Sequence, residues 1–121
     1  MRIGVLNLKE VLKTEYTESL VTTLMTAVGA ERQERISRYF LTEDKLRSLA
    51  AEHLLMTMLK EEAIMSEAEY PLKLVTGQNG KPEIEGHPEI HFNLSHAGEL
   101  VVCAMSAQYP VGVDVQDWRG I

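Results

Sequence analysis

Two oxygen-bearing side chains share one face of a short apolar segment near the end of the sequence. Asp114 and Gln116 are separated by one residue in Gly112-Val113-Asp114-Val115-Gln116, so an extended strand would place both on the same side. A carboxylate among valines is costly to bury unless it is paired or binds a metal. Mg²⁺ commonly takes one or two carboxylates together with substrate phosphates. The segment therefore predicts a magnesium site; the alternative is a strand-end aspartate that caps a turn.

A serine and a histidine stand next to each other in a second candidate strand, Phe92-Asn93-Leu94-Ser95-His96. Neighbouring side chains in a strand point to opposite faces, so Ser95 and His96 would not form a nucleophile–base pair. Both can still donate hydrogen bonds to a phosphate. The ordinary interpretation of His96 is a surface histidine at the end of a strand.

Basic residues gather in one stretch of the chain. Five of them fall within sixteen positions: Arg32, Arg35, Arg38, Lys45 and Arg47. A small polyanion such as a nucleotide could bind to this cluster, although interleaved glutamates make a solvated helix face the simpler interpretation. Lys81 follows the turn dipeptide Asn79-Gly80, where most lysines are solvated.

Composition narrows the class of protein. The chain has 121 residues, and 45% of them are hydrophobic and 25% charged, which is typical of one globular domain. The net charge of −6 argues against general nucleic-acid binding. No apolar run approaches the roughly 20 residues of a membrane helix, and Met1 to Leu8 does not resemble a secretory signal. Cys103 is the only cysteine, which excludes a disulfide scaffold, favours a reducing cytoplasm, and predicts a buried small side chain.

Hydrophobic periodicity predicts the elements that must position these residues. An alternating strand covers residues 2–8, and helices cover about 16–28, 30–40 and 42–62, with Thr42 as the N-cap of the last. The third helix is the longest and most apolar, so we expect it at the centre of the core. Strands follow at 72–76, 81–84, 90–94, 100–105 and 111–116. A strand, then helices, then an antiparallel sheet is an α+β pattern.

The order of the motifs resembles a known family. Gly80-Lys81-Pro82, then Asn93-Leu94-Ser95-His96, then Gly112-Val113-Asp114 follow the Arg-rich segment and the long helix. This order resembles the N-terminal half of the surfactin-synthetase type of 4′-phosphopantetheinyl transferases, over nearly the whole chain. The resemblance implies one half of a pseudo-twofold fold, with residues 1–121 as that half. It also implies Mg²⁺-dependent transfer of the phosphopantetheine arm of coenzyme A to a serine of an acyl or peptidyl carrier protein in fatty-acid, polyketide or nonribosomal-peptide synthesis.

The resemblance also implies roles for individual residues. Asp114 matches an aspartate that binds Mg²⁺, and Gln116 stands where many members have a glutamate ligand. Lys81, Ser95 and His96 match residues that contact the phosphates of coenzyme A. The basic positions around its 3′-phosphate and nucleotide end correspond to Arg32, Arg35 and Arg47.

One motif of the family that this chain resembles has no counterpart in this sequence. Its Trp-x-x-Lys-Glu helix follows the Gly-Val-Asp motif, whereas Lys60-Glu61-Glu62 precedes that motif and lacks the tryptophan. We therefore expect residues 1–121 to be an incomplete transferase that needs a C-terminal half or a second copy of the chain. The alternatives are a noncatalytic or homodimeric module that binds coenzyme A or carrier protein, and a plain α+β binding domain.

Overall fold

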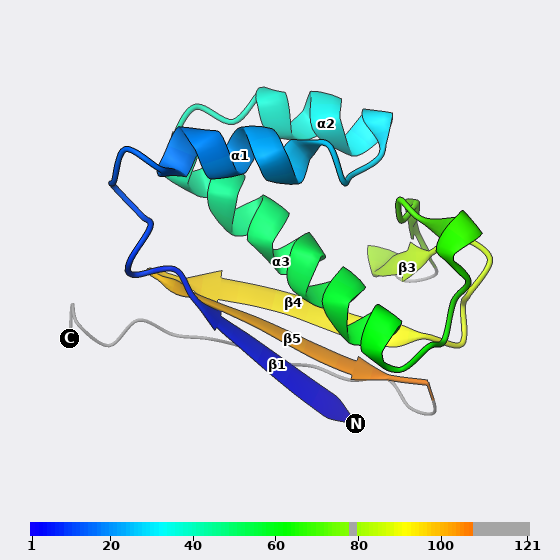
Figure 1. Cartoon of the computed structure of the whole chain (residues 1–121). Helices are drawn as coiled ribbons and strands as arrows, with labels where there is room; N and C mark the ends of the chain where they lie inside the picture. The colour runs from blue at the N-terminus through cyan, green and yellow to red at the C-terminus, as the bar shows by residue number, and fades with distance from the viewer. Residues whose placement is uncertain (78–79, 108–121) are drawn as a thin grey trace.

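The computed structural model describes residues 1–77 and 80–107, and the predicted strand at 111–116 lies outside them. The described residues form an α+β fold, as predicted (Figure 1). Its elements in chain order are β1 (Arg2–Asn7), α1 (Thr17–Met25), α2 (Ala30–Ser37), α3 (Thr42–Glu61), the short 3₁₀ helix η1 (Glu67–Glu69), β2 (Leu74–Thr76), β3 (Pro82–Ile84), β4 (His91–Ala97) and β5 (Leu100–Ser106).

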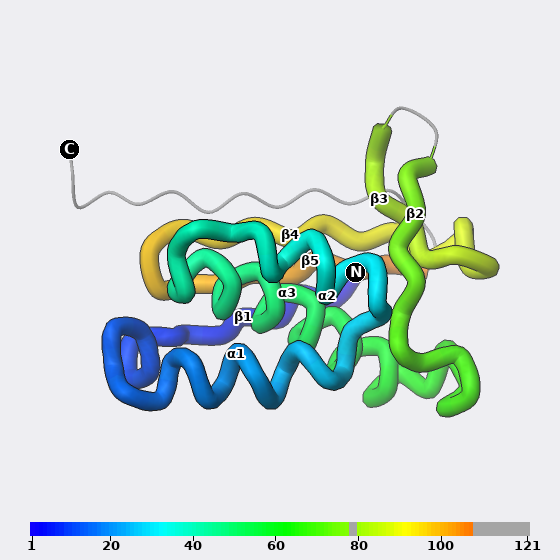
Figure 2. The backbone as a smooth tube through the Cα atoms, turned by 90° about the horizontal axis from the view of Figure 1, so that it is seen from above, coloured from blue at the N-terminus to red at the C-terminus, as the bar shows by residue number. Residues whose placement is uncertain are grey.

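The main sheet has three antiparallel strands in the order β1-β5-β4. The tight turn at Gly98, whose φ is 58°, joins β4 to β5 and pairs Ala97 with Leu100. The first strand of the chain therefore pairs with the last described one, Val5 opposite Val102. The β2–β3 hairpin is a separate two-stranded sheet and lies at the end of the main sheet where β4 begins (Figure 2).

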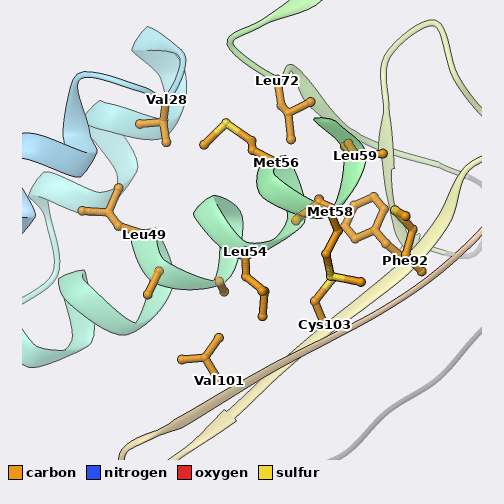
Figure 3. Packing of buried hydrophobic residues seen from close by; sticks show 14 of the residues in the cluster. Val28, Leu49, Leu54, Met56, Met58, Leu59, Leu72, Phe92, Val101 and Cys103 are labelled. Carbon is orange, nitrogen blue, oxygen red and sulfur yellow. The ribbon is translucent and has the colours of Figure 1, made fainter. Parts of the chain in front are cut away.

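The long helix α3 lies between the sheet and the other two helices (Figure 1). It is buried on several sides, as the apolar pattern predicted, because β strands cover one side and α1 and α2 cover the other. Leu54 and Met58 point toward the sheet, where Cys103 lies (Figure 3). Cys103 is fully buried, and burial raises the pKa of its thiol to about 12, so its predicted role as a small core side chain is confirmed.

Helix boundaries differ from the predicted ones in three places. The first helix ends at Met25 rather than near residue 28, and the second ends at Ser37, so Phe40 follows the helix and is 97% exposed instead of belonging to its apolar side. Thr42 is not the N-cap of α3, because Leu41 occupies that position without a side-chain cap. Glu43 and Asp44 do lie in the first turn, where the helix dipole favours acids.

The face of β1 turned away from α3 carries exposed apolar side chains. Ile3 and Val5 are 54% and 57% exposed, whereas Gly4 between them lies against Leu54 and Met58 of α3. Within residues 1–77 and 80–107, no helix combines the length and the apolar character that crossing a bilayer requires.

Candidate functional site

A cavity of about 770 Å³ opens where α2, the β2–β3 hairpin and β4 meet. The first turn of α2, the segment 71–76, the start of β3 and the middle of β4 line it. Three of the predicted basic residues, Arg32, Arg35 and Lys81, are among the lining side chains. Two segments far apart in the sequence, α2 and the residue before β3, thus bring positive charge to one cavity.

The N-terminus of α2 adds to this positive character. Gly29 is the N-cap and provides no side-chain cap, and it lines the cavity together with Ala30 and Glu31 of the first turn. The first N–H groups of a helix lack partners within the helix, and the helix dipole favours anions there. An anion in the cavity would meet both basic side chains and these backbone donors.

Most of the remaining lining is apolar: Pro71, Leu72, Leu74, Val75, Pro82, Phe92 and Leu94, with the polar residues Lys73, Thr76 and Asn93 beside them. Phe92 and Leu72 are almost completely buried in the core, so this part of the wall is continuous with well-packed structure. A cavity with an apolar wall and a few converging polar groups is typical of small-molecule sites. The arrangement suits a ligand that has both anionic and uncharged parts.

Arg32 is held against α3 by two hydrogen bonds. Its Nε donates to Oε1 of Glu52 at 2.9 Å, and its Nη2 donates to Oγ of Ser48 at 3.0 Å. Glu52 is completely buried; this burial raises the pKa of its carboxyl, and the nearby Arg32 opposes the rise. Sequence reasoning missed both α3 residues, although an acid among Ala50, Ala51 and Leu54 is a signal of a buried partner.

Ser95 and His96 lie further along β4 and Arg47 lies on α3, and none of the three lines the cavity. Ser95 is half-buried and His96 is exposed. Because they are neighbours in an extended strand, their side chains point to opposite faces, which argues against a nucleophile–base pair. Arg47 donates from Nε to the carbonyl of Gly98 at 2.7 Å and from Nη1 to Asp44 at 2.9 Å. It therefore ties α3 to the turn that follows β4.

The two predicted metal ligands, Asp114 and Gln116, lie outside the described residues. Within the described ranges, no cluster of three or more histidine, cysteine or acidic side chains could hold a metal ion. The predicted magnesium site therefore stays a prediction that depends on the oxygen chemistry of those two side chains.

A second polar cluster connects η1 with the loop before β4. Nε2 of His87 lies 2.5 Å from Oε1 of Glu69, and Nδ1 lies 3.0 Å from Oε1 of Glu89. The hydrogen bonds to Glu69 and then Glu89 raise the pKa of His87, and the bond to His87 lowers the pKa of both carboxyls. An imidazole with a carboxylate at each nitrogen is best satisfied when both nitrogens are protonated.

We expect the stability of the chain to fall as the pH rises through the raised pKa of His87. The stability that protonated His87 contributes is complete below its ordinary pKa of 6.5 and is lost as the pH rises through its raised pKa. The stability that the two carboxylates contribute is complete above their ordinary pKa of 4.5 and is lost as the pH falls through their lowered pKa values. Thermal unfolding should therefore have a higher midpoint at about pH 6 than at about pH 8. His87→Gln should reduce this difference, and His53→Gln, at an exposed site on α3, should not.

Comparisons with known proteins match most of this chain to one family. Residues 15–108 match the family model described as 4′-phosphopantetheinyl transferase, N-terminal. The chain is 30% identical over 97 residues to the 4′-phosphopantetheinyl transferase Sfp of Bacillus subtilis (strain 168), and 33% identical over 96 residues to another 4′-phosphopantetheinyl transferase of Bacillus subtilis. It is also 27% identical over 96 residues to the L-aminoadipate-semialdehyde dehydrogenase-phosphopantetheinyl transferase of Mus musculus.

The matches cover most of this chain but less than half of the relatives. The two bacterial alignments include 80% and 79% of this chain and 42% of each relative. The mouse alignment includes 75% of this chain and 30% of the relative. All the predicted basic and polar site residues up to His96 lie within the segment that matches the family model.

Proposed function

Because this chain belongs to the 4′-phosphopantetheinyl transferase family and corresponds to its N-terminal part, we propose that it binds coenzyme A for transfer of the phosphopantetheine arm to a carrier-protein serine. The serine oxygen would attack the phosphorus that bears the arm. A new phosphoester bond forms as the pyrophosphate P–O bond breaks, so the nucleotide part of coenzyme A leaves with its phosphate groups, and the serine proton passes to solvent. The partner supplies the nucleophile, so this chain needs none of its own.

The observation that carries the proposal is the gathering of Arg32, Arg35 and Lys81 around one cavity at the N-terminus of α2. Coenzyme A carries phosphate groups together with a long uncharged arm. Fixed cations and helix N–H groups stabilise such phosphates and the charge that develops on them during transfer. The apolar wall offers contacts for the uncharged parts. A protein with a net charge of −6 thus keeps local positive charge where a polyanion would bind.

Ser95 and His96 on β4, and Arg47 on α3 beside the turn that follows β4, extend the proposed site beyond the cavity. Asn93 lines the cavity, and Ser95 follows it on the same face of the strand. A ligand as long as coenzyme A can reach beyond the cavity toward these residues. We propose that Ser95 and His96 donate hydrogen bonds to phosphate oxygens, with Arg47 near the nucleotide end.

We propose Asp114 and Gln116 as oxygen ligands for Mg²⁺, a donor set of the type that this ion accepts. When bound, the ion would neutralise charge on the pyrophosphate oxygens. The reaction and the lone buried Cys103 fit a reducing cytoplasm, where we expect the protein to act.

The proposed complete transferase needs more than residues 1–121. The chain spans about 42% of the length of its bacterial relatives, and the exposed apolar residues Ile3 and Val5 on β1 offer a surface on which a further unit could pack. We expect this chain alone to bind coenzyme A weakly and to modify a carrier protein slowly or not at all.

Two measurements test the proposed function. Titration calorimetry with Mg²⁺ should detect binding of coenzyme A, and Asp114→Asn should weaken the Mg²⁺-dependent part. Mass spectrometry of an apo carrier protein incubated with coenzyme A should show little or no added phosphopantetheine. Absence of coenzyme A binding would contradict the proposed ligand, and rapid complete modification would contradict the need for a further unit.

A further inference from the structure

Glu52 is a buried carboxylate for which fold stability alone gives no account. It lies on α3 with no exposed surface. Its Oε1 accepts a hydrogen bond from Arg32, whereas Oε2 has no hydrogen-bond partner among the described residues. Burying a charge costs more than an apolar side chain of similar volume would, and replacement of a buried ion pair by apolar residues is often neutral or stabilising.

The partner of Glu52 is a lining residue of the cavity. Arg32 contacts Glu52 and Ser48, which lie one turn apart on α3, and its guanidinium has more N–H donors than these two contacts use. Two hydrogen bonds from different nitrogens restrict both the position and the plane of the guanidinium. Arg35, one turn further along α2, also lines the cavity but is exposed and makes no side-chain hydrogen bond with a described residue.

We propose that Glu52 is a positioning residue that holds the Arg32 guanidinium in place for a phosphate group bound in the cavity. The inference rests on the proposed function for the identity of the ligand. An arginine that is ordered before binding loses less side-chain entropy when it binds an anion. Glu52 therefore acts through Arg32 and does not touch the ligand.

The first test uses the chain without ligand. In NMR spectra of the ¹⁵N-labelled chain, the Nε–H signal of Arg32 is assigned by its disappearance in Arg32→Lys. The Nε–H group of Arg32 should be ordered and exchange slowly with solvent, whereas the Nε–H group of Arg35 should be mobile and exchange fast. Glu52→Leu should remove this difference. Glu52→Gln should keep it, because an amide oxygen can accept the same hydrogen bond. An Arg32 signal as disordered as that of Arg35 in the unchanged chain would overturn the proposal without any variant.

The second test measures coenzyme A binding by titration calorimetry. Glu52→Leu should weaken binding by about threefold to tenfold, the cost of ordering one long side chain, while Glu52→Gln should stay within about twofold because it keeps the hydrogen bond. Glu52→Leu leaves the partly buried Arg32 guanidinium without its ion-pair partner, so its thermal unfolding midpoint should fall; Arg32→Leu/Glu52→Leu, which removes both charges, should have a midpoint equal to that of the unchanged chain or higher. A purely structural role of Glu52 would lower the midpoint of Glu52→Leu and leave its affinity for coenzyme A unchanged, which would overturn the proposal.

A double-mutant cycle separates an effect through Arg32 from any other effect. In an Arg32→Ala background, Glu52→Leu should cause no further loss of affinity, because the residue that it positions is absent. An equal loss in both backgrounds would overturn the inference. If the unchanged chain binds no coenzyme A, the proposed function fails, and the Nε–H signals still decide whether Glu52 positions Arg32.

Discussion

Leu55→Ala should lower the free energy of unfolding by about 2–5 kcal/mol, the range for leucine truncation in a packed core. Leu55 is completely buried on α3, the helix that packs against both the sheet and α1. Neighbours on two sides of the helix restrict how far the structure can collapse into the space left, so the loss includes a cavity term as well as lost transfer energy. Urea denaturation followed by circular dichroism measures it.

Leu41→Ala is the matched control for this substitution. It removes the same atoms from a leucine that is 48% exposed and precedes the first turn of α3. We expect a change within about 0.5 kcal/mol, as for most surface substitutions. Similar losses for the two variants would contradict the central place of α3 in the core.

Periodicity was sufficient to predict the elements but not their partners. The apolar residues of α3 and the continuous apolar run of β5 are local patterns, and both elements form where the patterns indicated. Pairing of β1 with β5 joins residues about a hundred positions apart, and no local signal selects one strand over another. Sequence reasoning therefore did not predict that β5 pairs with β1 on one side and with β4 on the other; only the structure shows this order.

Predictions at helix ends failed because competing interactions there are weak and close in energy. Thr42 is a good N-cap residue by type, yet it is already the first residue of the helix, and Leu41 is the N-cap. The helix predicted to reach residue 40 ends at Ser37. Such ends depend on single hydrogen bonds rather than on the summed burial of several side chains.

The sequence predicted the charged residues of the candidate site but not the residues that hold them in place. Arg32, Arg35 and Lys81 were chosen by residue type and by resemblance, and the structure brings them to one cavity. The contacts that hold Arg32 come from Ser48 and Glu52, which belong to a different helix. The available signal was Ser48 and Glu52, which stand four residues apart, and so on one face, of the helix expected at the centre of the core.

The double variant Arg32→Ala/Lys81→Ala should weaken coenzyme A binding by about a hundredfold or more, since hydrogen bonds to charged groups each contribute roughly 1.5–3 kcal/mol. Arg32 lines the cavity from α2, and Lys81 lines it from the residue before β3. Because they come from different elements, neither side chain can make the other's contact with the ligand. Titration calorimetry at fixed ionic strength measures the change.

The control must remove the same charge from elsewhere on the chain. Arg38→Ala/Lys9→Ala also deletes two positive charges, from exposed residues that do not line the cavity. Its expected effect on affinity is less than about threefold at physiological salt, because exposed charges that do not contact the ligand are strongly screened by salt. Thermal unfolding of both variants would show whether either has lost its fold.

Comparison of the two double variants separates a built site from general electrostatic attraction. Contacts at the cavity predict a large loss for Arg32→Ala/Lys81→Ala that persists at high salt, because partly buried contacts are screened less than exposed ones. General attraction predicts equal losses for both variants that disappear as salt is added. Equal losses would show that the cavity residues act only through their charge, and the proposed coenzyme A site would then have to lie elsewhere on the chain.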